Sequence, residues 1–183
     1  LMIDSGANFG YFSCLWASLN NNNRVIAFEA SPDNIAPLIN NVNKNGFADK
    51  IKVVPAALSR SEGVIAFSRG GHASQTGWGG LMLCADDESV EVQADTLDRH
   101  MAAYPGVVID VLKIDTEGAD TWVLFGAEKL LKEKRIRHIF FELNRHRMSL
   151  LNINEQDAAV FLNKLDYTVE KFSATEFYAY PSK

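Results

Sequence analysis

The sequence predicts a doubly wound α/β fold, in which a mostly parallel sheet carries helices on both faces. Short apolar runs alternate along the chain with stretches of helical periodicity, as a succession of β-α units requires. Residues 107–114 form a nearly continuous apolar run, which is typical of a central parallel strand covered on both sides. With 183 residues, 47% of them hydrophobic, the chain has the size and composition of one compact domain spanning residues 1–183.

The first three elements follow from the N-terminal pattern. Residues 1–3 are apolar and precede an acid and a glycine turn, which predicts a short strand that ends there. Residues 9–19 carry apolar side chains at helical spacing, and the four asparagines at 20–23 favour a turn after that helix. The next apolar run, residues 24–28, is then the second strand.

A second helix, a third strand and an inserted hairpin are expected next. Ser31 or Asp33 can cap a helix that runs to about residue 45, where a glycine follows as a plausible stop. Residues 51–54 are apolar enough for a third strand. Residues 64–67 and 89–92 are expected to pair as a hairpin inserted before the central strand.

The C-terminal half continues the alternation. Residues 120–134 have a helical pattern that can break at Gly126, and residues 136–141 read as another buried strand. Asn154 can cap a helix that ends near residue 164. A hairpin-like pair finishes the sheet at residues 167–171 and 176–180.

Between the two hairpin strands lies a glycine-rich loop, residues 69–80. Five glycines favour a loop over a regular element, and the segment lacks the G-x-x-x-x-G-K-[ST] pattern of a phosphate-binding loop. Its side chains His72, Gln75 and Trp78 suit a loop that closes over a substrate. A simple surface loop explains the same composition, so both interpretations remain open.

The turn after the first strand is the most informative stretch, and it reads D-x-G-x-N-x-G from Asp4 to Gly10. Its glycines allow the backbone to approach a ligand closely. Glu29 ends the second strand and can accept hydrogen bonds from a ribose diol. A dinucleotide fingerprint would read G-x-G-x-x-G, and Asp4 would repel its pyrophosphate. A carboxylate there suits the ammonium of S-adenosylmethionine, although a tight turn capped by Asp4 is the purely structural alternative.

Several segments match a known family in order across most of the chain: residues 3–13, 25–32, 56–59, 95–98, 112–120 and 140–142. The chain thereby resembles the FkbM-type branch of the class I S-adenosylmethionine-dependent methyltransferases. The block from Lys113 to Ala119 is the one that indicates this branch, while Ser5 and Ala30 depart mildly from the family pattern. The resemblance implies the Rossmann-like, seven-stranded class I fold. It also implies that helical residues which help to cover the cofactor precede Leu1 and are missing from this chain.

The residues expected to bind S-adenosylmethionine lie after the first three strands and after the central strand. Ala56 and Ala57 have small side chains that leave room for the adenine ring. Asp115 falls where related methyltransferases place a residue beside the methyl donor. The expected cofactor-binding residues are Asp4, Ser5, Gly6, Ala7, Asn8, Gly10, Glu29, Ala30, Ser31, Ala56, Ala57 and Asp115.

Acids at the ends of parallel strands also point to catalysis, because converging carboxylates are costly unless they bind something. The cofactor supplies the activated methyl group, so the protein mainly positions the reactants, and a hydroxyl acceptor also needs a general base. Glu117 equally suits an acid at a helix start, and His146 equally suits an exposed histidine; His72 is a further candidate base. The expected catalytic residues are Asp115, Glu117, Glu142 and His146.

A divalent metal is compatible with these acids but is not required by their spacing. Asp115, Glu117 and Glu142 offer the hard oxygen ligands that magnesium uses. No His or Cys pattern with metal-ligand spacing accompanies them, and no metal ligands are assigned.

Charge and composition exclude several function classes. The net charge of -5 and the pI near 5.4 argue against a nucleic-acid or membrane-surface partner, and the basic segment 129–137 is the one hint of an acidic substrate or partner. No apolar run approaches the roughly 20 residues of a membrane span, and no signal peptide is visible. Cys14 and Cys84 read as free thiols in a reducing compartment, which predicts a cytoplasmic protein.

The sequence therefore predicts an S-adenosylmethionine-dependent O-methyltransferase acting on a hydroxyl of a small molecule or sugar, with the sugar preference resting on the resemblance alone. N-methylation is compatible with the same residues. A nicotinamide-dependent oxidoreductase is an alternative that would need a third glycine in dinucleotide spacing and a Tyr/Lys or similar hydride-transfer pair, and neither is found. A cofactor-binding module without catalysis is the other alternative. Nothing in the sequence indicates the oligomeric state.

Overall fold

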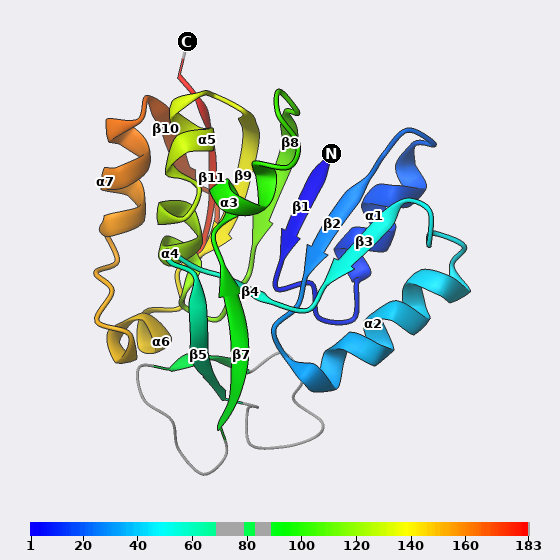
Figure 1. Ribbon diagram of the computed structural model, residues 1–183. Helices are drawn as coiled ribbons and strands as arrows, with labels where there is room; N and C mark the ends of the chain where they lie inside the picture. The colour runs from blue at the N-terminus through cyan, green and yellow to red at the C-terminus, as the bar shows by residue number, and fades with distance from the viewer. Residues whose placement is uncertain (69–78, 83–88, 183) are drawn as a thin grey trace.

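The computed structural model describes residues 1–68, 79–82 and 89–182, which form two sheets flanked by helices (Figure 1). The larger sheet has seven strands in the order β10-β11-β9-β8-β1-β2-β3, which confirms the expected sheet. Its strands are β1 (Met2–Ser5), β2 (Val25–Phe28), β3 (Ile51–Val54), β8 (Ile109–Ile114), β9 (Ile136–Glu142), β10 (Tyr167–Lys171) and β11 (Glu176–Pro181). The helices are α1 (Tyr11–Leu19), α2 (Pro32–Lys44), α3 (Leu97–Met101), α4 (Asp120–Phe125), α5 (Glu128–Lys132), α6 (Arg145–Leu150) and α7 (Asp157–Lys164).

The strand directions place the functional end of the sheet. β1 is parallel to both of its neighbours, β2 and β8, and the pairs β2–β3 and β8–β9 are also parallel. β11 runs antiparallel to β9 and β10. The chain moves outward from β1 to β3 and then returns to β8 on the other side of β1. Ligands of open α/β sheets bind beyond the carboxyl ends of the strands at such a switch point.

Helices cover both faces of this sheet, as predicted. Side chains alternate across a strand, so in β1 Met2 packs on one face and Ile3 on the other. The Met2 face buries Ala17 of α1 and Leu38 of α2, whereas the Ile3 face packs against α3, α4, α5 and α7 (Figure 1). Buried helix residues on that second face include Leu97, Met101, Val123, Leu124, Leu130, Leu131, Ala158 and Leu162.

A second, four-stranded sheet contains the expected hairpin and two strands that the sequence did not predict. Its order is β4-β7-β5-β6, with β4 (Ala57–Leu58), β5 (Gly63–Ser68), β6 (Gly80–Met82) and β7 (Ser89–Asp95). β5 and β7 pair antiparallel, as expected. Gly80 begins β6, so the predicted loop 69–80 extends one residue too far. His72, Gln75 and Trp78 lie outside the described residues.

One helix prediction in the C-terminal half is confirmed, and the predicted start of another helix is wrong. The expected break at Gly126 is confirmed, since α4 ends before it and α5 begins at Glu128. The helix expected from Asn154 begins instead at Asp157. Asn154 is held in the turn that precedes it, because its side-chain oxygen accepts the Gln156 amide at 2.9 Å while its own amide donates to Asp157 at 3.2 Å. α3 and α6 are too short for a periodic signal and were not predicted.

Replacing Gly126 with alanine is expected to lower the free energy of unfolding by about 1–3 kcal/mol, the usual cost of overpacking. Its φ of -71° suits any residue, but an added Cβ would lie 2.1 Å from the Ser59 carbonyl oxygen. Urea denaturation of the two proteins measures the difference. A variant as stable as the parent would show that the backbone at residue 126 can move away from the backbone at Ser59 at no cost.

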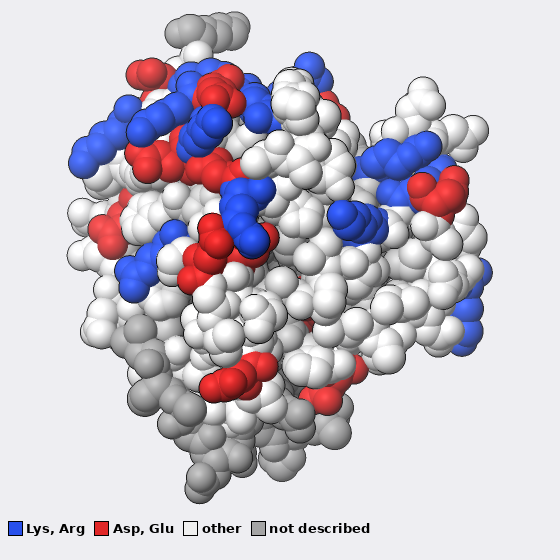
Figure 2. All heavy atoms as spheres, in the orientation of Figure 1, with Lys and Arg blue, Asp and Glu red and all other residues white. Residues whose placement is uncertain are grey.

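The basic segment 129–137 lies on a surface where positive and negative charges alternate (Figure 2). Its cations are largely paired with nearby carboxylates: Lys132 with Glu128, Lys134 with Asp166, Arg135 with Glu133 and Arg137 with Asp110. Exposed pairs of this kind contribute little stability. A solvated surface with paired charges therefore accounts for this segment without an acidic ligand.

Three further features concern membranes, thiols and metals. Within residues 1–68, 79–82 and 89–182, no helix has the length and apolarity to cross a bilayer. Cys14 is a partly buried free thiol, whereas Cys84 lies outside the described part of the chain. Among the residues with described positions, no three His, Cys, Asp or Glu side chains gather as a metal site would require.

Candidate functional site

A cavity opens beyond the carboxyl ends of β1, β2 and β8, at the switch point of the large sheet. Its volume is about 80 Å³, and it is partly open to solvent. Residues from the glycine turn, the end of β2, the segment after β3 and the end of β8 line it together. Predicted cofactor residues in its wall are Ser5, Gly6, Asn8, Glu29, Ala30, Ala56, Ala57 and Asp115.

The glycine turn forms one wall and is held in a conformation that few residues adopt. Gly6 and Gly10 have φ angles of 77° and 83°, and Asn8 has a φ of 50°. The amides of Gly6 and Ala7 both donate to the Phe28 carbonyl at 3.0 and 2.9 Å, which ties the turn to β2. A Cβ on Gly6 would lie only 1.9 Å from the Asp115 carbonyl oxygen. Glycine at this position therefore allows the ends of β1 and β8 to approach each other.

Glu29 lies between this turn and the start of α2. Its Oε2 accepts the Asn8 amide at 2.6 Å, and its Oε1 accepts the Ser31 amide at 2.8 Å and the Asn34 side chain at 3.4 Å. The residue is only 5% exposed, and burial raises the pKa of its carboxyl while these hydrogen bonds oppose the rise. Carboxylate oxygens have further acceptor capacity, so Glu29 can still bind a diol in the cavity.

Small and apolar side chains form a slot next to Glu29. Ala30, Ala56 and Ala57 line it together with larger apolar residues of β2, β4, β5 and β6. The larger ones are Phe28, Leu58, Phe67 and Leu81. This apolar lining beside the buried Glu29 carboxylate is chemically compatible with an adenosine group.

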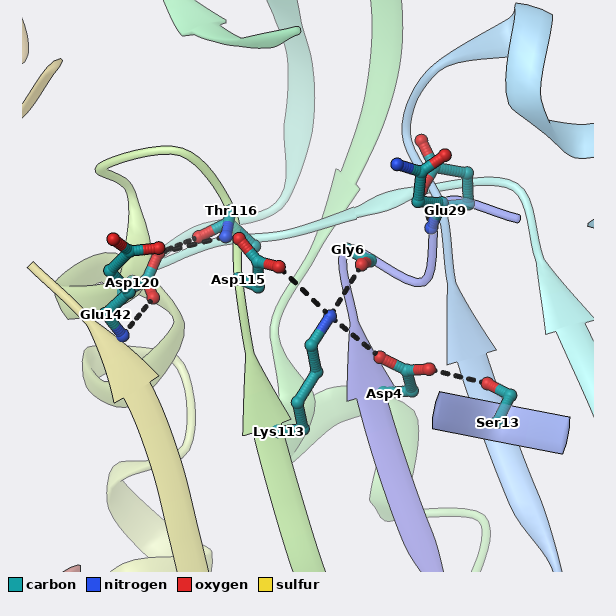
Figure 3. A network of polar contacts seen from close by, with 10 residues as sticks. Asp4, Gly6, Ser13, Glu29, Lys113, Asp115, Thr116, Asp120 and Glu142 are labelled. Atoms are coloured by element: carbon teal, nitrogen blue, oxygen red, sulfur yellow. Dashed lines mark hydrogen bonds and ion pairs between the residues drawn. The ribbon is translucent and has the colours of Figure 1, made fainter. Parts of the chain in front are cut away.

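Asp4 is buried below the turn and is not among the residues that line the cavity. Its carboxylate accepts the Ser13 hydroxyl at 2.6 Å and lies 3.2 Å from the Lys113 ammonium (Figure 3). Lys113 also donates to the Gly6 carbonyl at 2.8 Å and lies 3.5 Å from Asp115. The charge of Asp4 is thus balanced within the protein. Its contact with a cofactor ammonium stays a prediction.

Lys113 was not singled out in the sequence as a site residue. The signal was present, because a lysine within the apolar run 107–114 has to be paired when the strand is covered on both faces. Three further predicted cofactor residues, Ala7, Gly10 and Ser31, do not line the cavity. Ala7 is buried in the core, Gly10 precedes α1, and Ser31 supplies the amide that binds Glu29.

Two of the four predicted catalytic residues, Asp115 and Glu117, line the cavity. Glu117 has a left-handed φ of 52° and accepts the Asn144 side-chain amide at 2.9 Å. Burial, and then the charge of Asp115, raise the pKa of the Glu117 carboxyl. A carboxylate with a raised pKa beside a ligand cavity has the property expected of a general base.

Glu142 and His146 lie elsewhere. Glu142 lines an apolar groove that adjoins the cavity and shares Asp115 with it. His146 is exposed on α6 and lines neither the cavity nor this groove. The structure therefore brings Asp115, Glu117 and Glu142 toward one region and leaves His146 outside it.

Asp120, the first residue of α4, is a further acid near the site that sequence reasoning missed. It is 1% exposed and accepts hydrogen bonds from Thr116 and from the Glu142 amide. Burial raises the pKa of its carboxyl from 3.8 to about 6, against the lowering effect of these hydrogen bonds. The sequence signal was an acid directly after the block 113–119.

The raised pKa of Asp120 predicts a pH-dependent stability. Between pH 3.8 and about 6, the Asp120 carboxyl is protonated more often in the folded state than in the unfolded state. The stability that this proton binding contributes is therefore lost as the pH rises through this window. About two pKa units correspond to about 3 kcal/mol. The free energy of unfolding of the parent minus that of Asp120→Asn should therefore fall by most of that amount between pH 4 and pH 7 in urea denaturation. A constant difference would contradict the raised pKa.

Comparison with known proteins agrees with this geometry. A family model described as the methyltransferase FkbM domain matches residues 4–169. A comparison with curated proteins gave no match. The chain is similar to the crystal structure of Methyltransferase FkbM from Methylobacillus flagellatus KT, with a TM-score of 0.65 and 17% identity over 98% of this chain and 43% of that one. It thus spans less than half of that protein.

Two other solved structures show the same fold at lower identity. A putative O-methyltransferase from Klebsiella pneumoniae has a TM-score of 0.56 and 9% identity, over 100% of this chain and 73% of that one. A protein in the NADB-Rossmann superfamily from Streptococcus agalactiae has a TM-score of 0.56 and 13% identity, over 99% and 61%. The fold is therefore the Rossmann-like fold of class I methyltransferases.

Proposed function

Because the chain belongs to the FkbM methyltransferase family, we propose that it transfers a methyl group from S-adenosylmethionine to a hydroxyl oxygen of a small molecule or sugar. The observation that carries the proposal is one cavity lined by the buried carboxylate of Glu29, by small and apolar side chains, and by the acids Asp115 and Glu117. S-adenosylmethionine has a ribose diol, an adenine ring and a positively charged sulfur, which are chemically complementary to these three kinds of lining.

The residues present fit this cofactor. Ala30, Ala56 and Ala57 leave space for a ring, and Glu29 can accept the ribose hydroxyls. The absent side chain of Gly6 allows the backbone to form a cradle between β1 and β8. When bound, S-adenosylmethionine supplies a methyl group activated by its positive sulfur.

The protein's own part in the reaction is to orient the reactants and accept a proton. Asp115 and Glu117 place negative charge in the cavity wall, where it favours a cationic ligand over a neutral one. A hydroxyl acceptor loses its proton during methyl transfer, and the carboxylate of Glu117 is the group that receives it. Its raised pKa brings it closer to the value that suits a base near neutral pH.

The acceptor class is supported by charge as well as by family. The net charge of -5 and the mixed charges seen in Figure 2 favour a small acceptor over a nucleic acid or a membrane surface. The name of the Klebsiella pneumoniae structure includes O-methyltransferase, which supports the same reaction type. We also propose that the protein is cytoplasmic.

Calorimetric titration with S-adenosylhomocysteine, with NADH in a parallel cell, tests the proposal. We expect micromolar binding of S-adenosylhomocysteine and none of NADH. Binding of NADH alone would replace the proposal with a dinucleotide enzyme, and binding of neither would remove the cofactor site. Transfer of a radiolabelled methyl group to a panel of hydroxyl compounds, with matched amines as controls, then separates O-methylation from N-methylation.

A further inference from the structure

We propose that Asp120 is a positioning residue of the methyl-transfer site. It holds the cavity acids Asp115 and Glu117 in one arrangement and anchors their loop to the end of β9. The inference rests on the proposed function and adds to it a residue that lies outside the cavity.

The contacts of Asp120 join two strand ends. Its Oδ1 accepts the backbone amide of Thr116 at 3.0 Å and the Thr116 hydroxyl at 2.7 Å. Its Oδ2 accepts the amide of Glu142 at 3.0 Å. Figure 3 shows Asp120 between the loop after β8 and the end of β9. One buried carboxylate therefore connects the two parallel strands beyond the last residues that pair them.

This pattern differs from ordinary helix capping. Asp120 is the first residue of α4, yet its three hydrogen bonds all go to groups outside that helix. The cost of burying its charge is offset only if these donors stay in place. The loop it binds therefore has one strongly preferred position.

The loop needs such an anchor. Thr116 lies between Asp115 and Glu117, so fixing Thr116 fixes the backbone from which both acids project into the cavity. Glu117 has a left-handed φ of 52°, a conformation that is strained for a non-glycine residue and persists where the surroundings enforce it. Without the Asp120 contacts the loop would relax, and the acids would lose their fixed distance to a bound ligand.

Comparing the dissociation constants of S-adenosylmethionine and S-adenosylhomocysteine tests this arrangement. The two differ by one methyl group and one positive charge, so the ratio of their dissociation constants reports the negative charge held at the transfer point. We expect the parent protein to prefer the cationic ligand. Asp120→Asn should lower this preference at least fivefold while the dissociation constant for S-adenosylhomocysteine changes less than twofold.

The asparagine variant breaks one contact selectively. Its amide oxygen can still accept both hydrogen bonds from Thr116, but its NH₂ group would face the Glu142 amide, which is also a donor. Asp98→Asn is the matched control. Asp98 accepts the amides of Lys129 and Leu130 at 2.8 and 3.0 Å and lines neither the cavity nor the groove. It should lose stability and keep the ligand preference.

A second pair of variants covers the case in which Asp120→Asn does not fold. Thr116→Val removes one hydrogen bond to Asp120 and keeps the backbone amide, so it should lower the ligand preference less than Asp120→Asn does. Thr116→Ser keeps the hydroxyl and should restore the parent value. Rescue by serine distinguishes loss of the hydrogen bond from a change in packing.

The outcomes separate this inference from the function on which it rests. If the parent binds neither ligand, the proposed function fails and the inference fails with it. If the parent binds both and the preference is unchanged in Asp120→Asn and in Thr116→Val, the inference alone is overturned. Equal weakening of both ligands would also overturn it, because that result describes a general structural role.

Discussion

Replacing Gly6 with alanine is expected to abolish cofactor binding and to lower the free energy of unfolding by about 2–5 kcal/mol. About 1–2 kcal/mol comes from placing a Cβ at a φ of 77°, which disfavours every residue except glycine. The remainder comes from the new Cβ, which would lie 1.9 Å from the Asp115 carbonyl and force β1 and β8 apart. Because Asp115 lies in the cavity wall, this displacement also deforms the site.

Gly46→Ala is the matched control for this prediction. Gly46 has a similar φ of 72°, but no atom lies within 4 Å of the position that an added Cβ would occupy. It should lose only about 1–2 kcal/mol, the cost of the backbone conformation, and bind S-adenosylhomocysteine normally. Urea denaturation and calorimetry measure both quantities. Equal losses of stability in the two variants would show that the close approach to the Asp115 carbonyl adds nothing to the cost of Gly6→Ala.

Replacing Glu29 with alanine is expected to weaken S-adenosylhomocysteine binding by about 1.5–3 kcal/mol, which is roughly a 10- to 150-fold rise in the dissociation constant. The variant loses the carboxylate proposed to bind the ribose diol. It also frees the amides of Asn8 and Ser31, so the glycine turn and the start of α2 lose their common partner. Calorimetric titration of the folded variant measures the change.

Glu29→Gln separates these two effects. The glutamine oxygen can still accept the Ser31 amide, but its NH₂ group faces the Asn8 amide and carries no charge. We expect it to bind more tightly than the alanine variant and more weakly than the parent. An unchanged dissociation constant in folded Glu29→Ala would remove Glu29 from the cofactor site.

Much of the large sheet was predictable because its elements carry local signals. The alternation of apolar runs with helical periodicity predicted its strands, and Gly126 marked the break between α4 and α5. The small sheet was predictable only in its hairpin. β4 and β6 have two and three residues, and strands that short have no period to detect.

The candidate site was predictable to the extent that strand ends meet at one edge of a parallel sheet. That rule placed Gly6, Glu29 and Asp115 together, and the cavity contains all three. The rule does not decide between a base and an exposed surface histidine at position 146. The structure shows His146 exposed on α6, where it lines neither the cavity nor the adjoining groove. The rule also did not reveal that Lys113 lies in contact with Asp4.

The sequence by itself determined the fold class, the family and the chemical types at the site, because glycine turns, strand-end acids and apolar periodicity are local properties of the chain. Only the tertiary structure decided which acid lines the cavity and which is buried and paired with other groups of the protein. Three of these acids have a partner that is distant in sequence: Lys113 for Asp4, Asn144 for Glu117 and the Glu142 amide for Asp120. Hydrogen bonds and burial depend on those partners, and they set both the charge and the position of each carboxylate.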